Sequence, residues 1–210
     1  MNLFLVRHTE IVATAEQCIG QSEVKLSEKG KADVVKLAEK LKSLAPNVVI
    51  SSDLSRCRVL AEVVAKAVKA ELVLKSAWRE INFGQWEGKV WSEIDARDHV
   101  HYEAWAKDFV AVAPPEGESF SSLQARIARE LNALSTYPAE RIMVVTHAGA
   151  IRAAIASAIN LPLERMFSIH LNYGALVQLR LNSGIWTLQD LNNSLLTLPC
   201  NQPSANLHEC

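Results

Sequence analysis

The first predicted strand of this chain ends in an arginine and a histidine. Residues 3–6 read Leu-Phe-Leu-Val, an apolar run of strand length, and Arg7 and His8 follow it directly. In open α/β sheets, ligands bind in the crevice beyond the carboxyl ends of the strands. The pair would present a fixed cation beside an imidazole to such a ligand. Taken alone, the pair more often begins a polar loop, so the rest of the chain decides between the two interpretations.

A second predicted strand brings a second histidine. Residues 142–145 form another buried apolar run, which leads through a threonine to His147. The helix that follows, residues 150–159, is rich in small side chains, which favours close packing of a helix on a sheet. Between strand and helix, Ala148 and Gly149 allow the backbone to approach a ligand closely.

The remaining sequence alternates between strand and helix patterns, as in an α/β protein. Further strands are predicted at 48–50, 72–74, 176–181 and 185–188, the last two as an antiparallel pair that Leu171 precedes. Helices are predicted from Ser27 through Leu44, from Arg56 through Val68, over 92–109, and from Ser119 or Ser121 through Leu134. No linker or repeat divides the chain. We therefore expect one domain over residues 1–192 and a loose tail over 193–210.

Two polar segments are candidates for ligand-binding loops. Residues 9–26 exceed a plain connector in length, and such a loop either closes over a ligand or is a surface excursion. Residues 78–88 contain two glycines and two tryptophans without a regular period, which indicates a structured loop anchored by its rings. In that loop Glu80 or Glu87 is expected to face a cavity, although either is equally consistent with an ordinary surface acid.

The charge balance and composition argue against nucleic acid and membranes as partners. The 22 Lys and Arg residues nearly balance the 23 Asp and Glu residues, so no basic field indicates nucleic acid or a membrane surface. No apolar run approaches a membrane span, and four cysteines without metal-ligand spacing or a secretory leader predict reduced thiols in a cytoplasmic protein. His99 and His101 are two residues apart and would not face each other on a helix, so no metal site is predicted there.

Five residues whose side chains can take part in catalysis or ligand binding follow strand ends or lie in neighbouring loops. They are Arg7, His8, Arg56, Glu80 and His147. Planar guanidiniums bind phosphoryl oxygens in a bidentate manner. Two guanidiniums and two imidazoles without a metal cluster therefore suit a phosphate monoester. We expect a small phosphorylated substrate and no cofactor, and the sequence leaves the oligomeric state open.

Four motifs in this order resemble the histidine phosphatase (phosphoglycerate mutase-like) superfamily over residue 3 to about residue 190. They are Arg-His-Thr-Glu at 7–10, Ser-Asp-Leu-Ser-Arg at 52–56, Glu-Ile-Asn-Phe-Gly-Gln-Trp-Glu-Gly at 80–88 and Val-Thr-His-Ala-Gly at 145–149. The resemblance implies a three-layer α/β/α sandwich with a mostly parallel central sheet.

The resemblance also implies roles. His8 would be the nucleophile, Arg7, Arg56 and His147 would hold phosphoryl oxygens, and Glu80 would be the general acid and base. Further substrate contacts are implied for Thr14, Gly20, Gln21 and Ala148. Thr9 replaces the family's usual glycine and Thr14 its usual asparagine, which affects the fine geometry of the phosphate pocket.

The resemblance implies a phosphatase that acts through a phosphohistidine, and three other functions remain open at this point. One is a broad-specificity phosphatase of the same superfamily. A phosphoglycerate mutase of the same superfamily would usually need a longer insert after the Glu80 loop to enclose its substrate. A binding protein without turnover is the alternative of another class, and the presence of all five catalytic residue types argues against it. For an apolar leaving group we expect contacts from Trp86, Phe120 and Tyr173.

Overall fold

A six-stranded mixed sheet forms the centre of the computed structural model, which describes residues 1–14 and 16–197. The strands are β1 (Asn2–Arg7), β2 (Val48–Ser51), β3 (Glu71–Leu74), β4 (Arg141–Thr146), β5 (Leu176–Asn182) and β6 (Ile185–Asn192). Their spatial order is β3-β2-β4-β1-β5-β6. The first four are parallel to one another, β5 runs antiparallel to β1, and β6 runs antiparallel to β5. The predicted strands and the antiparallel closing pair are confirmed.

The register of β1 and β4 brings the two histidine-bearing strand ends together. Arg7 pairs with Thr146, and the His8 backbone N–H donates to the Thr146 carbonyl over 3.0 Å. His8 and His147 therefore leave two adjacent strands at the same level. Because parallel strands share one carboxyl edge, the edge of the sheet carries both imidazoles.

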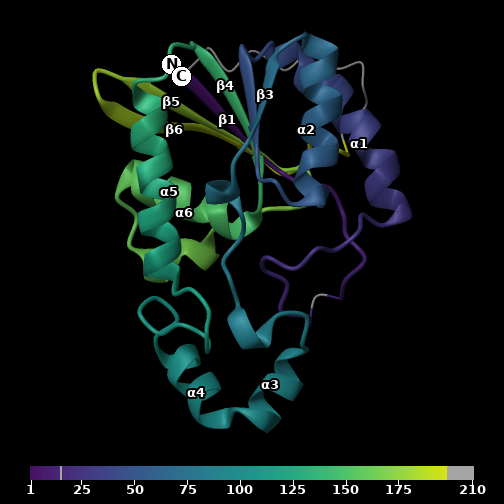
Figure 1. The fold of residues 1–210 in the computed structure, drawn as a ribbon. Coiled ribbons are helices and arrows are strands. Elements are labelled where there is room, and N and C mark those ends of the chain that lie inside the picture. The colour runs from purple at the N-terminus through teal and green to yellow at the C-terminus, as the bar shows by residue number, and fades with distance from the viewer. Residues whose placement is uncertain (15, 198–210) are drawn as a thin grey trace.

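Helices cover both faces of the sheet and complete the three layers. The helices are α1 (Glu28–Leu41), α2 (Ser55–Val68), α3 (Trp91–Arg97), α4 (His99–Lys107), α5 (Phe120–Ser135) and α6 (Ala148–Ile159). Figure 1 shows α1 and α2 on one side and α5 and α6 on the other. Alternate residues of β1 accordingly enter two different cores, Leu3 and Leu5 on the α5–α6 side and Phe4 and Val6 on the α1–α2 side. No helix in the described part of the chain is both long and apolar enough to cross a membrane.

The helix predicted over 92–109 is wrong as a single element. The chain forms α3 and α4, which are separated by Asp98 with φ −139° and ψ 46°. This break lets Trp91 stack on Trp105, with ring centroids 5.3 Å apart. A continuous helix would separate these residues by about 21 Å along its axis. The packing of Trp91 on Trp105 therefore outweighs the helical pattern of apolar residues that predicted one continuous helix.

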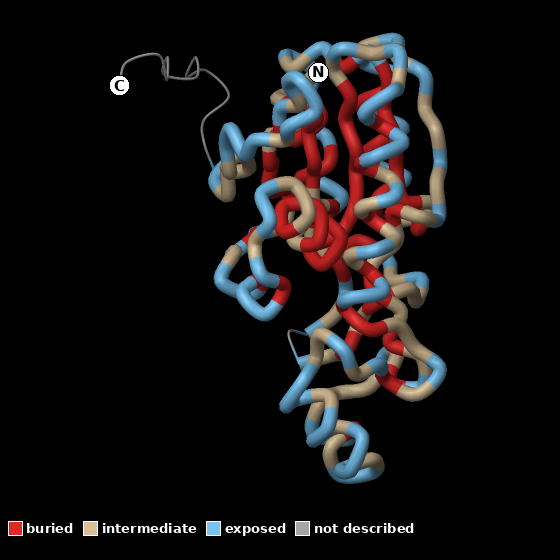
Figure 2. Tube along the Cα trace, turned by 90° about the vertical axis from the view of Figure 1, so that its left-hand side faces the viewer, coloured by how far each residue is buried: buried red, intermediate tan, exposed pale blue. Residues whose placement is uncertain are grey.

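The α3–α4 region extends beyond the carboxyl edge of the sheet. Figure 1 shows it as a separate projection, and Figure 2 shows that its chain is largely intermediate or exposed, whereas buried residues gather along the central strands and the helix faces that pack on them. Ile94 is the one buried residue of the two helices. We call residues 84–118 the aromatic extension.

Smaller differences concern element ends. The first helix ends at Leu41, and Leu44 lies in the 3₁₀ turn η1 (Lys42–Leu44), while Leu171 precedes β5 without joining a strand. The predicted cap at Ser27 is confirmed, and Ser119 rather than Ser121 caps α5. In the expected tail, Asn193 bonds to His170 and Asn172, and Leu195 and Leu196 pack on the α1–α2 core. Packing therefore continues to these residues, and positions 198–210 lie outside the described chain.

Candidate active site

A cavity of about 340 Å³ opens at the carboxyl edge of the sheet, beside the end of β1. We call it the cation cavity. It is lined by Arg7, His8, Ile11, Ala13, Thr14, Gln17, Ile19, Arg56, Glu80 and Tyr173. Four of the five residues of the predicted constellation therefore surround one space.

His8 presents one nitrogen to this cavity with its lone pair available. Its Nδ1 lies 2.7 Å from the Thr9 carbonyl oxygen, which only accepts hydrogen bonds, so Nδ1 carries the proton. The lone pair is then on Nε2. Burial, followed by the charges of Arg7 and Arg56, lowers the pKa of His8 well below its usual value. A neutral, fixed imidazole of this kind can attack phosphorus.

Two guanidiniums provide the positive charge. Arg7 donates from Nη1 to the Leu171 carbonyl over 2.5 Å, and its guanidinium carbon lies 4.1 Å from the Tyr173 ring centroid. Arg56 is almost fully buried and donates from its two terminal nitrogens to the carbonyls of Ser22 and Gly20. Each terminal nitrogen carries a second N–H, so both side chains keep donors for phosphoryl oxygens. The fixed bonds hold these donors in place.

His147 lies against His8 but does not line the cation cavity. The two ring centroids are 5.2 Å apart. Its Nδ1 accepts from Arg56 Nε over 3.3 Å, and its Nε2 lies 2.9 Å from Ser52 Oγ. Since both ring nitrogens are engaged, a direct phosphate contact requires Nε2 to exchange Ser52 for the phosphate. Burial, together with the neighbouring cations, lowers the pKa of His147 well below its usual value.

Glu80 is held at the opposite wall by backbone groups. Its carboxylate accepts from the Gly149 N–H over 2.9 Å and from the Ile81 N–H over 3.0 Å. A Cβ at position 149 would stand 2.1 Å from Glu80 Oε1, so only glycine permits this approach. Sequence analysis did not identify Arg126, which donates to the carbonyls of Ala77, Arg79 and Glu80 and thereby fixes the Glu80 segment from behind.

Glu87, the other acid of this loop, binds backbone N–H groups and has a structural role. Its carboxylate accepts from the backbone N–H groups of Gly20, Gln21, Ser22 and Phe83. The same segment supplies the two carbonyls that accept from Arg56. Glu87 thus holds the loop that holds Arg56, and Glu80 is the acid that reaches the cation cavity.

Of the additional substrate contacts implied by resemblance, one lies at the cation cavity. Thr14 lines it. Gly20 and Gln21 direct their N–H groups to Glu87, and Ala148 begins α6 without lining the cavity. The hydroxyl of Thr9, the residue that replaces the usual glycine, is buried and has no hydrogen-bond partner in the described chain.

A second cavity, of about 240 Å³, adjoins the first. The two share the side chains of Gln17, Ile19 and Glu80. The rest of its wall is mostly aromatic, and two of its rings, Trp91 and Trp105, come from the aromatic extension. It consists of Cys18, Ile81, Phe83, Trp91, Trp105, Phe120, Gly149, Arg152 and Phe167. We call it the aromatic cavity. Phe120 is placed here as expected, whereas Tyr173 lies in the cation cavity and Trp86 in neither.

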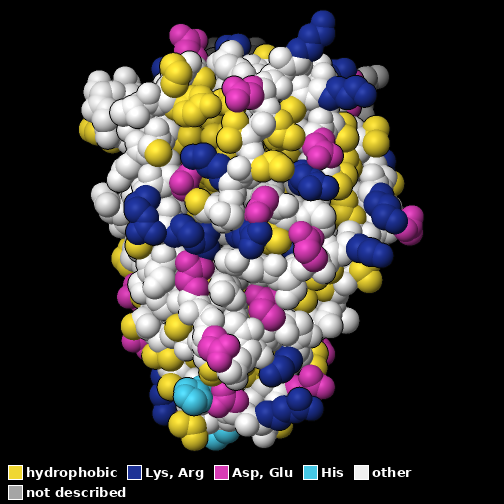
Figure 3. All heavy atoms as spheres, viewed as in Figure 1, with side chains coloured by type: hydrophobic (Ala, Val, Ile, Leu, Met, Phe, Trp, Pro, Cys, Tyr) yellow, Lys and Arg dark blue, Asp and Glu magenta, His cyan; other side chains and the backbone are white. Residues whose placement is uncertain are grey.

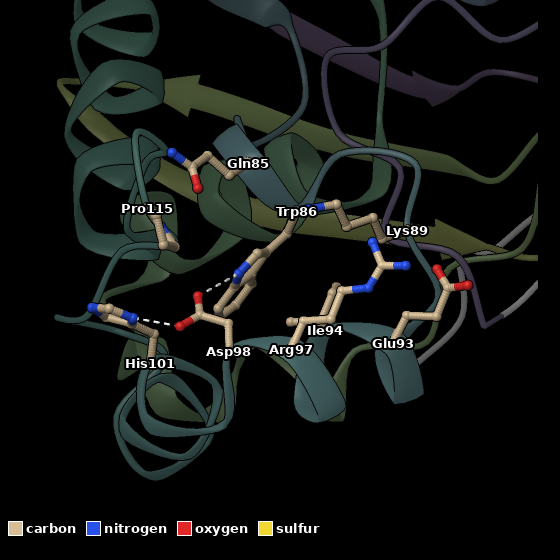
Figure 4. A pocket seen from close by; sticks show the side chains of 9 residues that line it. All are labelled: Gln85, Trp86, Lys89, Glu93, Ile94, Arg97, Asp98, His101 and Pro115. Atoms are coloured by element: carbon tan, nitrogen blue, oxygen red, sulfur yellow. Dashed lines mark hydrogen bonds and ion pairs between the residues drawn. The ribbon is translucent and has the colours of Figure 1, made fainter.

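A third cavity lies within the aromatic extension, away from His8 (Figure 4). Trp86 lines it and donates from Nε1 to Asp98, which also bonds to His101. His99 bonds to Asp95. These contacts pair each histidine with a separate carboxylate. In the described residues, no group of three or more His, Cys, Asp or Glu side chains is placed to hold a metal ion.

The face of the molecule that Figure 3 presents has no large field of one charge. Figure 3 shows Lys and Arg side chains interspersed with Asp and Glu side chains over the face that it presents. Cationic character is instead concentrated at Arg7 and Arg56 in the cation cavity. The arrangement suits a small anionic ligand.

Comparisons with known proteins find similar sequences and similar folds. A sequence profile of the histidine phosphatase superfamily (branch 1) matches residues 3–194. The adenosylcobalamin/alpha-ribazole phosphatase of Escherichia coli K12 is 27% identical over 94% of both chains, and a probable phosphoglycerate mutase GpmB of Erwinia tasmaniensis is 32% identical over 77% of this chain and 76% of that protein. The crystal structure of alpha-ribazole phosphatase from Shigella flexneri has a TM-score of 0.86 at 27% identity and covers 93% of this chain and 97% of its own.

A second solved structure includes a ligand. A mycobacterial glucosyl-3-phosphoglycerate phosphatase in complex with inorganic phosphate has a TM-score of 0.80 at 27% identity, over 93% of this chain and 98% of its own.

Proposed function

This chain belongs to the histidine phosphatase superfamily, and we propose that it is a metal-independent phosphomonoesterase that dephosphorylates α-ribazole 5′-phosphate. The observation that carries the proposal is the cation cavity, where a neutral His8 with a free Nε2 shares one space with Arg7, Arg56 and Glu80. Nucleophile, charge stabilisation and proton donor are thus available together.

In the first step, the Nε2 lone pair of His8 forms a bond to phosphorus while the bond from phosphorus to the leaving oxygen breaks. Glu80, in its protonated form, gives its proton to that oxygen. Arg7 and Arg56 donate to the equatorial oxygens, where negative charge spreads during transfer. His147 joins them when its Nε2 exchanges Ser52 for a phosphoryl oxygen.

In the second step, water attacks the phosphohistidine. The Glu80 carboxylate takes a proton from the water as the new oxygen–phosphorus bond forms, and the nitrogen–phosphorus bond breaks with its electron pair returning to Nε2. Inorganic phosphate leaves, and Glu80 is again protonated. Thus one carboxyl group serves both steps.

The proposed substrate rests on the aromatic cavity. A ribosyl phosphate that carries dimethylbenzimidazole needs an apolar, ring-lined space beyond the scissile bond, and this cavity adjoins the cation cavity at Glu80. The loop sequences at 82–87, 115–120 and 170–175 resemble those of α-ribazole-5′-phosphate phosphatases. A role in cobalamin nucleotide-loop assembly, in the cytoplasm, follows from this assignment.

Rapid acid quench with labelled substrate tests the mechanism. We expect acid-labile, alkali-stable phosphate on the wild-type protein and none on His8→Ala, because only an imidazole nitrogen forms that linkage here. Labelling of a cysteine or serine would contradict the mechanism. Absence of turnover with every phosphate ester would instead support a binding protein.

A comparison of substrates tests specificity. We expect kcat/KM for α-ribazole 5′-phosphate to exceed that for ribose 5-phosphate and 3-phosphoglycerate by at least about tenfold, or roughly 1.4 kcal/mol. The similarity to a probable phosphoglycerate mutase motivates the second candidate function. Interconversion of phosphoglycerates without release of phosphate would establish that activity, and equal rates would indicate a broad-specificity phosphatase.

A further inference from the structure

Arg152 has unused hydrogen-bond donors at the aromatic cavity. It lies on α6, one turn after His147, and lines this cavity together with Glu80 and Gly149. Its Nε donates to the Ile169 carbonyl over 2.9 Å. Its two terminal nitrogens have no acceptor among the residues that the structure describes. The side chain is partly exposed, so these donors are not sealed in the core.

Among the described residues, the Arg152 guanidinium contacts an aromatic ring and forms no ion pair with a carboxylate. Its guanidinium carbon lies 5.4 Å from the centroid of Phe167, a cation–π contact that orients the group. Burial lowers the pKa of Arg152, and the charge of Glu80 counteracts this effect. An arginine stays charged under such conditions, so the cavity contains a cation without a bonded anion.

The position of Arg152 places these donors on the leaving-group side of the reaction. Glu80 lines both cavities, and the Gly149 N–H that anchors its carboxylate lies three residues before Arg152. A group bonded to phosphorus at His8 would pass Glu80 before it entered the aromatic cavity. The atoms nearest the scissile oxygen would then meet Arg152, and more distant apolar atoms would meet the rings.

We propose that Arg152 determines specificity by donating hydrogen bonds to oxygen acceptors of the leaving group, so that the enzyme favours sugar-bearing or carboxylate-bearing alcohols over purely apolar ones. This inference rests on the proposed phosphatase activity of the same site. Two N–H groups on separate nitrogens match either the two oxygens of a carboxylate or a pair of hydroxyls. The ring walls then accept any apolar remainder.

Three substrates distinguish hydroxyl acceptors from a carboxylate acceptor. The leaving group of ribose 5-phosphate offers hydroxyls, that of 3-phosphoglycerate adds a carboxylate, and that of phenyl phosphate offers neither. For Arg152→Met we expect kcat/KM to fall at least about tenfold with ribose 5-phosphate, with 3-phosphoglycerate or with both, and to stay within about twofold with phenyl phosphate. The larger loss identifies the preferred acceptor. Arg152→Lys should restore part of the loss, since it keeps the charge without the planar fork.

Arg165→Met is the matched control, because Arg165 is exposed on the neighbouring 3₁₀ turn and lines neither cavity. It should behave as wild type with all three substrates. Retained turnover of phenyl phosphate by Arg152→Met also reports an intact fold. An equal loss on all three substrates, or no loss on any, would overturn the inference. Failure of the α-ribazole assignment would appear separately, as a lack of preference for that ester by the wild-type enzyme.

Discussion

The two cavities that meet at Glu80 are built in different ways. The cation cavity is formed at strand ends, where backbone ladders and carbonyl acceptors fix His8 and Arg56. The aromatic cavity takes its wall from several separate segments, among them Trp91 and Trp105 of the aromatic extension and Phe167, which is 52% exposed. From this difference we expect the cation cavity to perform the chemistry and the aromatic cavity to select the leaving group, so substitutions in the two cavities should change different kinetic quantities.

The largest effect is expected at the boundary between the cavities. Glu80→Gln should lower kcat about 10²- to 10⁴-fold with little change in substrate binding, because its proton is needed in the transition state. The loss should be smaller with p-nitrophenyl phosphate, whose leaving group needs no proton. Steady-state kinetics with an alkyl and an aryl phosphate measure the difference.

Glu87→Gln is the informative comparison for that variant. Glu87 binds backbone N–H groups of the loop under Arg56, so its loss should act equally on both substrates and lower the melting temperature. A larger kinetic effect from Glu87→Gln than from Glu80→Gln, confined to the alkyl ester, would assign the proton transfer to Glu87.

The cation cavity at the edge of the sheet was largely predictable from the sequence. The apolar runs before His8 and His147 are continuous, and parallel strands place their carboxyl ends at one edge, so the meeting of these residues follows from local patterns. The residue pattern alone did not distinguish Glu80 from Glu87, because both acids occupy one loop, and the preference for Glu80 came from the family resemblance. The folded chain adds that Glu80 lines the cation cavity and that Glu87 binds backbone N–H groups.

The extension was less predictable because its structure depends on long-range aromatic contacts. The helical period across residues 92–109 continues through Asp98, yet Trp91 and Trp105 stack only if the helix breaks there. Trp86 was expected near the leaving group because it is an aromatic side chain of a candidate ligand-binding loop, but its ring packs in the extension. Arg152 and Arg126 carried no local signal, since an arginine on an amphipathic helix is ordinarily a solvated residue.

Acid should destabilise the folded protein through His8 and His147. The pKa values of His8 and His147 are lowered in the folded state, so the unfolded chain binds more protons below its ordinary histidine pKa of about 6.5. The free energy of unfolding should therefore decrease as the pH falls from about 7.5 to 5. His8→Asn should reduce this decrease by at least about 1 kcal/mol, measured by urea unfolding at both pH values.

His99 provides the control of opposite sign. Its bond to Asp95 raises the pKa of His99, so the stability that it contributes is present below the unfolded pKa and lost as the pH rises through the folded pKa. His99→Gln should leave the acid destabilisation at least as large as in wild type. An unchanged pH dependence in His8→Asn would mean that the His8 imidazole titrates normally in the folded protein.

Substitutions in the aromatic cavity should change kcat/KM in a way that depends on the leaving group. Phe167→Ala removes an exposed ring that lines the aromatic cavity and contacts Arg152. We expect kcat/KM for α-ribazole 5′-phosphate to fall about 3- to 10-fold, the equivalent of roughly 0.5–1.5 kcal/mol for an aromatic pair, and a smaller loss with 3-phosphoglycerate, which has no apolar group for the ring to contact. Val100→Ala, on the exposed surface of α4, should change neither rate. Equal losses for both esters would make the ring a structural element.

The smallest effect is expected from metal removal, which isolates the charge chemistry of the cation cavity. Arg7 and Arg56 provide the positive charge that a divalent ion supplies in other phosphatases, and their geometry is set by carbonyl acceptors. Activity should stay within about twofold after dialysis against EDTA, with or without added Mg²⁺, when α-ribazole 5′-phosphate turnover is followed by phosphate release. If EDTA abolishes turnover and Mg²⁺ restores it, the histidine and aspartate side chains of residues 95–103 become the first place to seek the ion, and Asp98→Asn would then have to reproduce the loss. Retained activity in EDTA together with a strong loss in Arg7→Met would place the required charge on the protein itself.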